Sequence, residues 1–361
     1  MLHVVAAGEL GGAERMLADL ATPRPSEGLE HCVALLPAKA ALEPFFREHG
    51  IEVHAQPPSP EHAGIYLARA FGGQDLRWLG RTIDAFSPNV LHLHTVGSQV
   101  LGTRAALRRR VPVLRTEHST RAYDDRTVWP FSRWSLQRVD AAVAISQHIA
   151  DTVLQRAPWA KPKLHTIANG VDTARFARAE LPAVAPFRFV LSGRLEPRKG
   201  IDIALEALAL TPEAELCIVG DGPLRVQLEQ QAARLGVTNR TLFVGHQPDV
   251  RPHLRSAHAV LSSSRKEGLG LAVLEAMAMG RPAVAVPVGG LPEFVNKSTG
   301  FLAATSRAQD LAAAMTQAIQ APNLTALGQT ARQLVEQQYS IEAMRERYAA
   351  LYRQLSLRCA P

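Results

Sequence analysis

The chain of 361 residues is long enough for two domains of ordinary size, each with its own hydrophobic core. Hydrophobic residues make up 47% and charged residues 20% of the chain, a balance typical of a globular protein. The three cysteines, Cys32, Cys217 and Cys359, have no metal-ligand spacing, and their odd number excludes a closed disulfide framework.

Several features predict a cytoplasmic protein. Cys32 and Cys217 lie in apolar, strand-like runs, which favours buried free thiols and a reducing compartment. The first residues form a strand-like run at 2–7 rather than a basic segment followed by a long apolar stretch, so we expect no signal peptide. No charge-free run reaches the roughly 18 apolar residues of a membrane span, so we expect no transmembrane helix.

The net charge of +7 comes with a local excess of arginine between residues 104 and 138. Such a basic face predicts an anionic partner, which could be phosphate groups, nucleic acid or an anionic membrane surface. A solvated face with ordinary arginine enrichment is the alternative. The arginines concerned are Arg104, Arg108, Arg109, Arg110, Arg115, Arg121, Arg126, Arg133 and Arg138.

In the first half, short apolar runs alternate with helical patterns. We expect strands at 2–7, 32–36, 90–94, 112–116 and 141–145. The helices between them include 13–20, 77–86 and 149–155. Continuous apolar strands separated by helices indicate a parallel sheet that is covered on both faces.

A break follows at 171–186, where the sequence has no periodic run and 181–186 (LPAVAP) resembles a linker. The alternation then restarts. We expect strands at 188–192, 216–219, 241–244, 259–262 and 283–286, and helices at 201–210, 224–235, 269–279 and 341–355. The predicted fold class is α/β, with two Rossmann-like domains at 1–172 and 173–340, a cleft between them and a closing helix at 341–361.

The segment after the expected strand at 259–262 predicts a phosphate site. A polar turn carries Glu267, and Gly268, Leu269 and Gly270 then lead into a helix whose first N–H groups are donors for an anion. Eight residues after Glu267, Glu275 lies among apolar neighbours, and ligand hydroxyls would satisfy its carboxylate. Purely structural roles for the two glutamates are the alternative.

A second basic segment, SGRLEPRKG at 192–200, follows the first strand of the second half. Arg194 and Lys199 emerge near the end of that strand, where they can stabilise the charge of a departing diphosphate. The sequence contains no Asp-x-Asp pair and no Cys/His cluster along the chain, so we expect no catalytic metal.

These segments resemble the retaining glycosyltransferases of family 4, which have the two-Rossmann-domain GT-B fold. The resemblance rests on the Glu-x7-Glu segment, on GRLEPRKG, on GGAER at 11–15 and on NGVD at 169–172. It implies that Glu267 contacts hydroxyls of the transferred sugar and that Glu275 holds the ribose of the nucleotide. It further implies that the last helix crosses back onto the N-terminal domain.

The resemblance also implies which residues surround the diphosphate. Arg194 and Lys199 would neutralise it, and glycines of the N-terminal turn would approach it. His118 would lie close to the reacting sugar, with a core or exposed histidine as the alternative. Apart from the resemblance, His92 and His94 alternate with leucines in LHLHT and so share one strand face, where His94 either lines the floor of the cleft or, as we favour, has a structural role. The backbone groups concerned belong to Gly11, Gly12, Gly268, Leu269, Gly270 and Leu271.

The expected function is therefore metal-independent, retaining transfer of a hexose from a UDP- or GDP-sugar, without a cofactor. The acceptor would be a glycan, a lipid-linked molecule or a small molecule, with cell-envelope polysaccharide synthesis as the setting. The basic N-terminal half further predicts peripheral association with the inner face of an anionic plasma membrane.

Two other functions are open at this stage. An NAD(P)-dependent dehydrogenase could also have paired Rossmann units. However, neither GELGGA nor GDGPLR matches G-x-G-x-x-G, and no acidic residue ends the second strand. A basic phosphate or nucleic-acid binder is supported by charge alone. Because we find no recognition motif, we expect no nucleic-acid partner.

Overall fold

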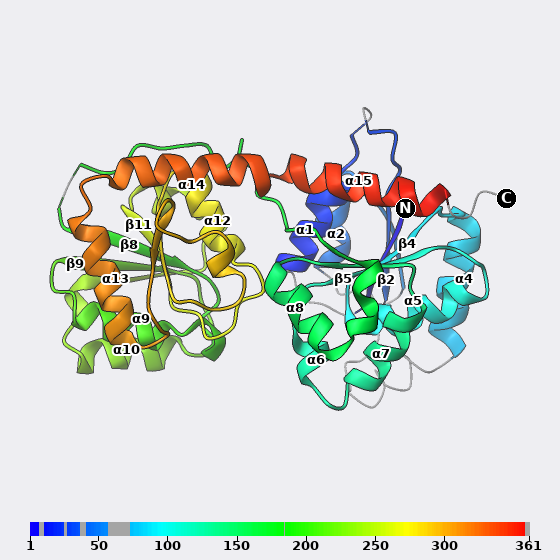
Figure 1. The fold of residues 1–361 in the computed structure, drawn as a ribbon, viewed down its shortest axis with the longest axis horizontal. Helices are drawn as coiled ribbons and strands as arrows, with labels where there is room; N and C mark the ends of the chain where they lie inside the picture. The colour runs from blue at the N-terminus through cyan, green and yellow to red at the C-terminus, as the bar shows by residue number, and fades with distance from the viewer. Residues whose placement is uncertain (7–10, 25–26, 37–40, 57–72, 184, 358–361) are drawn as a thin grey trace. The chain divides into compact units, whose positions relative to one another are not determined.

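A computed structural model describes the chain except for residues 7–10, 25–26, 37–40, 57–72, 184 and 358–361 (Figure 1). The chain divides into two compact units. The first comprises Met1–Ala168 together with Met344–Pro361, and the second comprises Asn169–Ala343. The aperiodic segment lies in the second unit, and its described residues between 172 and 186 form neither helix nor strand.

The first unit contains a seven-stranded parallel sheet in the order β3-β2-β1-β4-β5-β6-β7. The strand order reverses between β1 and β4, which is where Rossmann-like sheets bind ligands. The strands are β1 Leu2–Ala6, β2 Cys32–Leu36, β3 Glu52–Ala55, β4 Leu91–Leu93, β5 Val113–Glu117, β6 Ala141–Ala144 and β7 Leu164–Thr166. The five expected strands are thus confirmed, and β3 and β7 are additional.

Helices connect these parallel strands, and several begin at clear caps. Thr95 accepts a hydrogen bond from the Ser98 amide at the start of α5, and Ser146 accepts one from the Ile149 amide at the start of α8. The helices are α1 Gly12–Ala21, α2 Leu42–Glu48, α4 Gly73–Phe86, α5 Val96–Leu107, α6 Arg121–Asp124, α7 Trp129–Arg138 and α8 Gln147–Arg156.

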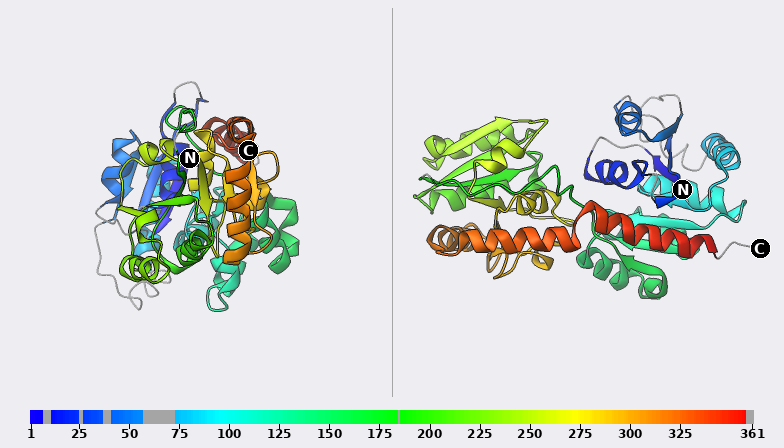
Figure 2. Two further views of the ribbon diagram at one scale, coloured as in Figure 1. Left: turned by 90° about the vertical axis from the view of Figure 1, so that its left-hand side faces the viewer. Right: turned by 90° about the horizontal axis from the view of Figure 1, so that it is seen from above.

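The last helix, α15 (Ile341–Leu357), adds its buried face to the core of the first unit. Tyr348 and Tyr352 are fully buried there, together with Met16 of α1 and Leu114 of β5. Arg345 donates to Glu27 Oε1 at 2.8 Å and to the carbonyl oxygens of Asp19 in α1 and of Thr22 just after it. The expected return of the chain to the N-terminal domain is confirmed, and Figure 2 shows α15 in red along this unit.

The second unit contains a six-stranded parallel sheet in the order β10-β9-β8-β11-β12-β13. Its strand order reverses between β8 and β11. The strands are β8 Phe187–Ser192, β9 Ala214–Val219, β10 Thr241–Gly245, β11 Ala259–Ser262, β12 Ala283–Ala285 and β13 Gly300–Leu302. The helices are α9 Ile201–Ala209, α10 Arg225–Arg234, α11 Arg251–Arg255, α12 Leu271–Ala278, α13 Ala308–Gln320 and α14 Leu324–Gln338.

Candidate active site

In the second unit, the basic motif at 192–200 and the acidic motif at 262–275 meet at one edge of the sheet. The loop after β8 carries Lys199, and the loop after the neighbouring strand β11 carries Glu267. Because parallel neighbours end at the same edge, the two side chains come together there. Lys199 Nζ lies 2.7 Å from Glu267 Oε2, and the side chains are only 15% and 12% exposed.

The Glu267 carboxylate is engaged on one side. Ser264 Oγ donates to Oε2 at 3.2 Å, so Oε2 accepts from both Ser264 and Lys199. Within the part of the chain that the structure describes, no hydrogen bond is recorded to Oε1. The ion pair therefore fixes the carboxylate and leaves one oxygen as an acceptor for ligand hydroxyls.

Glycine permits the close approach of the two loops. Gly200 has φ +60°, and a Cβ atom at this position would lie 2.1 Å from the carbonyl oxygen of Ser263. Ser263 Oγ in turn donates to the Lys199 carbonyl oxygen at 3.2 Å. A side chain at residue 200 would force the loops apart and separate Lys199 from Glu267.

The helix expected at 269–279 begins slightly later, at Leu271, because Gly270 has a left-handed backbone with φ +103°. A small cavity lies beside this helix start, lined by Ser192, Lys199, Ser262, Glu267, Gly270 and Val273 among others. The first turn of α12 thus adjoins the Lys199–Glu267 pair. This is the position that a helix start needs if its N–H groups are to bind a diphosphate there.

The remaining residues predicted in this unit occupy related positions. Arg194 lies in the same loop as Lys199 and is exposed. Glu275 lies within α12 and is half-buried among buried apolar neighbours. Gly268 is half-buried and Leu269 is buried, and both precede the helix. The motifs at 192–200 and 262–275 therefore share one strand-end region of this sheet.

The residues predicted in the first unit also lie at strand ends. Gly11 precedes α1, its amide donates to Glu14 Oε2 at 3.0 Å, and Gly12 is the first residue of the helix. Residues 7–10 of the same turn lie outside the described residues. His118 follows β5, its Nε2 lies 3.5 Å from His94 Nδ1, and burial lowers its pKa to about 4. His118 is therefore neutral at physiological pH.

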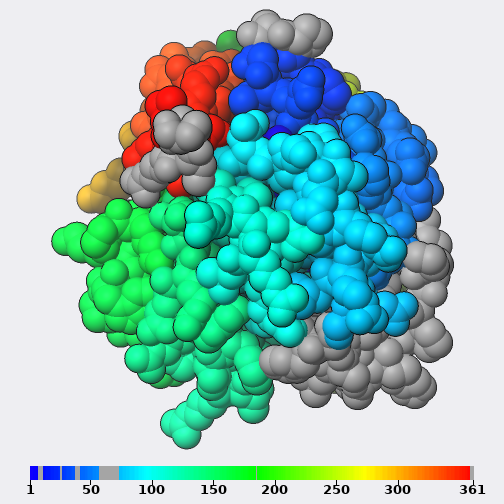
Figure 3. Space-filling view, turned by 90° about the vertical axis from the view of Figure 1, so that its right-hand side faces the viewer, coloured from blue at the N-terminus to red at the C-terminus, as the bar shows by residue number. Residues whose placement is uncertain are grey.

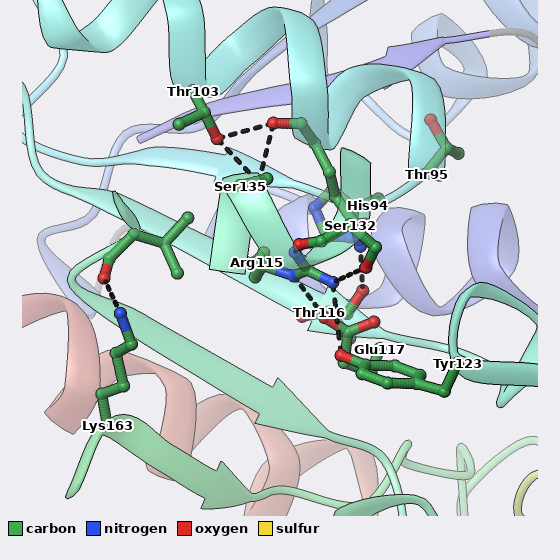
Figure 4. Close-up of polar contacts among 12 residues, drawn as sticks. His94, Thr95, Thr103, Arg115, Thr116, Glu117, Tyr123, Ser132, Ser135 and Lys163 are labelled. Carbon is green, nitrogen blue, oxygen red and sulfur yellow. Dashed lines mark hydrogen bonds and ion pairs between the residues drawn. The ribbon is translucent and has the colours of Figure 1, made fainter. Parts of the chain in front are cut away.

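A buried ion pair holds the end of β5, just before His118. The Arg115 guanidinium binds Glu117, and it also donates to the Ser132 carbonyl at 2.9 Å and to the Tyr123 hydroxyl at 3.3 Å (Figure 4). Arg115 is completely buried. The prediction that it belongs to a basic face is therefore wrong. The sequence signal for this ion pair was the two-residue spacing of Arg115 and Glu117, which places both side chains on the same face of a strand.

Other arginines of this unit do form a basic surface. Arg77, Arg81, Arg108 and Arg109 line one pocket, which also includes Leu76. Arg109 donates to Asp84 through two nitrogens at 2.6 and 2.7 Å, whereas Arg77, Arg81 and Arg108 are exposed. Arg77 and Arg81 belong to α4, and Arg108 and Arg109 directly follow α5. Figure 3 shows the face of the first unit that contains these two helices, which are coloured cyan.

Although no Cys/His cluster is visible along the sequence, the fold brings three histidines of the first unit together. Ligand atoms of His3, His92 and His94 lie within 4.8 Å of one another. Both ring nitrogens of His92 are engaged, by the hydroxyls of Tyr352 and Thr116, each at 2.8 Å. The hydrogen bonds therefore account for the arrangement of this ring.

No helix among the described residues is both long and apolar enough to cross a bilayer.

Both halves of the chain match families of known proteins. Residues 10–175 match the family described as Glycosyltransferase Family 4, and residues 174–339 match Glycosyl transferases group 1. Glycogen synthase of Mycobacterium tuberculosis is 31% identical over 300 residues, which are 78% of this chain and 71% of that protein. The lipopolysaccharide core biosynthesis glycosyltransferase LpsE of Rhizobium meliloti is 32% identical over 222 residues, or 60% of this chain and 64% of LpsE.

Solved structures show the same fold. The Anabaena protein HepE in complex with UDP matches 98% of this chain and 99% of its own, with a TM-score of 0.86 at 23% identity. The two Rossmann-like units thus have the GT-B architecture. Together with the family matches and the identity to glycogen synthase, this shows that the chain belongs to the glycosyltransferases.

Substitution of Gly200 tests how the two loops are held together. We expect Gly200→Ala to lower the free energy of unfolding by more than about 3 kcal/mol, since it combines left-handed strain with a backbone clash. Gly236→Ala is the matched control, because φ is +70° there but nothing lies within 4 Å of an added Cβ atom. It should cost only the strain of about 1–2 kcal/mol. Equal losses in urea unfolding would contradict the close-approach argument.

Proposed function

We propose that the protein transfers a hexose from a UDP- or GDP-sugar to a glycan, lipid-linked or small-molecule acceptor, with retention of anomeric configuration and without a metal ion. The observation that carries the proposal is the Lys199–Glu267 pair beside the start of α12, at the switch point of the second sheet. We infer a role in cell-envelope polysaccharide synthesis, which the similarity to LpsE supports.

Each proposed donor contact follows from the chemistry of its group. The fixed carboxylate of Glu267 accepts hydrogen bonds from sugar hydroxyls, and Glu275 accepts them from the ribose. Arg194, Lys199 and the backbone amides at the helix start bind the diphosphate. The structure of HepE in complex with UDP supports a nucleoside diphosphate as a ligand of this protein. No resident cofactor is part of the proposal.

The proposed chemistry is a front-face transfer. The glycosidic bond to the diphosphate breaks as the acceptor oxygen bonds to the anomeric carbon on the same face. The departing phosphate oxygen takes the acceptor proton. Lys199 and Arg194 stabilise the negative charge that develops on the diphosphate, the task that a metal ion performs in other transferases. On this proposal, neutral His118 contacts the transferred sugar, and the glycines at Gly11 and Gly12 allow the donor to approach the first unit.

Ligand-induced stabilisation tests the donor site. UDP or GDP at 100 times its dissociation constant should stabilise the native state by about 2.7 kcal/mol and raise the melting temperature. The shift should persist in EDTA and be lost in Glu275→Ala. A shift with neither nucleotide, or one that requires NAD⁺ or an added metal, would overturn the proposal. The nucleotide that binds identifies the base.

Replacement of Lys199 tests the chemical step. We expect Lys199→Ala to reduce kcat about 10²–10³-fold, because one preorganised donor to the leaving group is lost. Lys266→Ala makes the same change on an exposed residue next to Glu267 and should leave kcat nearly unchanged. Single-turnover kinetics with the nucleotide sugar identified above would measure both. A Lys199 variant with wild-type turnover would remove this residue from the mechanism.

We further propose that the protein is cytoplasmic and associates with the inner face of the plasma membrane. The exposed side chains of Arg77, Arg81 and Arg108, which line one pocket, support binding to anionic headgroups. Each arginine contributes about 1 kcal/mol to such binding. Arg81→Glu with Arg108→Glu should therefore weaken co-sedimentation with phosphatidylserine vesicles, whereas Arg234→Glu on α10 should not. Binding that is independent of anionic lipid would contradict this.

A further inference from the structure

Four histidines of the first unit are joined by a continuous series of hydrogen bonds. His31 Nδ1 lies 2.8 Å from His3 Nε2, and His3 Nδ1 lies 3.0 Å from His94 Nε2. His94 Nδ1 lies 3.5 Å from His118 Nε2, the longest of the three links. His31 directly precedes β2, His3 lies in β1, and His94 and His118 follow β4 and β5. The series therefore crosses four neighbouring strands of the sheet.

The arrangement is head to tail, because every link joins Nδ1 of one ring to Nε2 of the next. A neutral imidazole has one N–H donor and one acceptor nitrogen. If His31 donates from Nδ1, then His3, His94 and His118 must each donate from Nδ1 as well. If His118 donates from Nε2, all four rings carry the proton on Nε2. The geometry thus permits only two states, and all four rings have the same tautomer in each.

Burial keeps these rings neutral. It lowers the pKa of His31 to about 3 and that of His118 to about 4, and it holds the pKa values of His3 and His94 well below the usual range. The described titratable or charged groups that act on the four rings are the Met1 ammonium, Glu27, His92, Arg345 and Tyr352. None of them interrupts the three links.

Each end of the series presents a nitrogen without a hydrogen-bond partner among the described residues. At one end this is His31 Nε2 and at the other His118 Nδ1, and both atoms are buried. His31 also lines an open pocket together with Met1, Glu30 and Arg353. His118 is at the opposite edge, at the carboxyl ends of the strands, where ligands of such sheets bind.

We propose that His31, His3 and His94 are positioning residues for His118, and that the four rings form one proton relay. The relay makes His118 Nδ1 a donor or an acceptor toward the bound sugar according to the state of His31 at the far edge of the sheet. The inference rests on the proposed function where it places a sugar at His118. The coupling between the rings does not depend on it.

The relay moves one proton without accumulating charge. Starting with all rings protonated at Nε2, His118 Nδ1 takes up a proton from water at the carboxyl ends of the strands, and its Nε2 proton passes to His94 Nδ1. The Nε2 proton of His94 passes to His3 Nδ1, and that of His3 to His31 Nδ1. The Nε2 proton of His31 leaves to water in the pocket. Each ring gains one proton and loses one, and all four end with the proton on Nδ1.

The wild-type protein gives the first test. Long-range ¹H–¹⁵N NMR of the full-length, ¹⁵N-histidine-labelled chain assigns the tautomer of each ring at neutral pH, without any substrate. We expect His3, His31, His94 and His118 to have the same tautomer. His92, whose two nitrogens both face hydroxyls, is the internal control with no required state. A mixture of tautomers among the four rings would overturn the relay.

A pair of substitutions at His31 tests the coupling directly. A carboxylate in His31→Glu can only accept from His3, and we expect this to place the His118 proton on Nε2. An ammonium in His31→Lys can only donate to His3, and we expect this to place it on Nδ1. The difference should disappear when His3→Leu is added to both variants. The same His118 tautomer in both folded single variants would overturn the proposal, and the wild-type spectrum decides the matter if either variant does not fold.

Turnover separates the relay from its use in catalysis. With a nucleotide sugar that saturates both variants, the two tautomers should give kcat values that differ at least several-fold, while binding of the nucleoside diphosphate is unchanged. Inverted tautomers with equal kcat would confirm the relay and exclude contact between His118 and the sugar. If neither the variants nor the wild type binds the nucleotide, the proposed function is refuted, and the NMR test of the relay is unaffected.

Discussion

The candidate donor site depends on how closely two backbone segments approach each other. The loops after β8 and β11 meet where the Gly200 backbone lies against the Ser263 carbonyl, with no room for a Cβ atom. This contact brings Lys199 within 2.7 Å of Glu267, and the resulting ion pair is largely removed from solvent. A partly buried pair of this kind is stabilised only when further hydrogen bonds satisfy it, and Ser264 supplies one. The position of the pair at the switch point of the sheet then makes it available to a ligand.

The first unit differs in that polar side chains are buried where its sheet packs against the last helix. His3, His92 and Thr116 are buried beneath Tyr348 and Tyr352 of α15, where unpaired polar atoms would be costly. Hydrogen bonds between these groups reduce that cost. Because α15 supplies both tyrosines, the end of the chain completes a polar core that begins at its third residue.

The ends of β4 and β5 are consequently fixed from two sides. Arg115 and Glu117 hold one face of β5 against Tyr123 and Ser132, while Thr116 holds the other face through His92 and Tyr348. A strand end that is restrained on both faces places the following residue, His118, with little freedom. This rigidity suits the role proposed for His118, in which one particular nitrogen faces a ligand.

The sequence by itself determined the class of fold and the location of the motifs proposed to bind the donor. Strand–helix alternation is a local pattern, and the glycines at residues 200 and 270 mark turns that few other residues adopt, so both features are visible along the chain. Only the tertiary structure decided that Arg115 is buried, that Lys199 pairs with Glu267 and that four histidines form one series. The reason is distance along the chain: His3 and His94 are 91 residues apart, and His92 and Tyr352 are 260 apart. A side chain's partner at such separation is set by strand order and helix packing, which local periodicity does not specify.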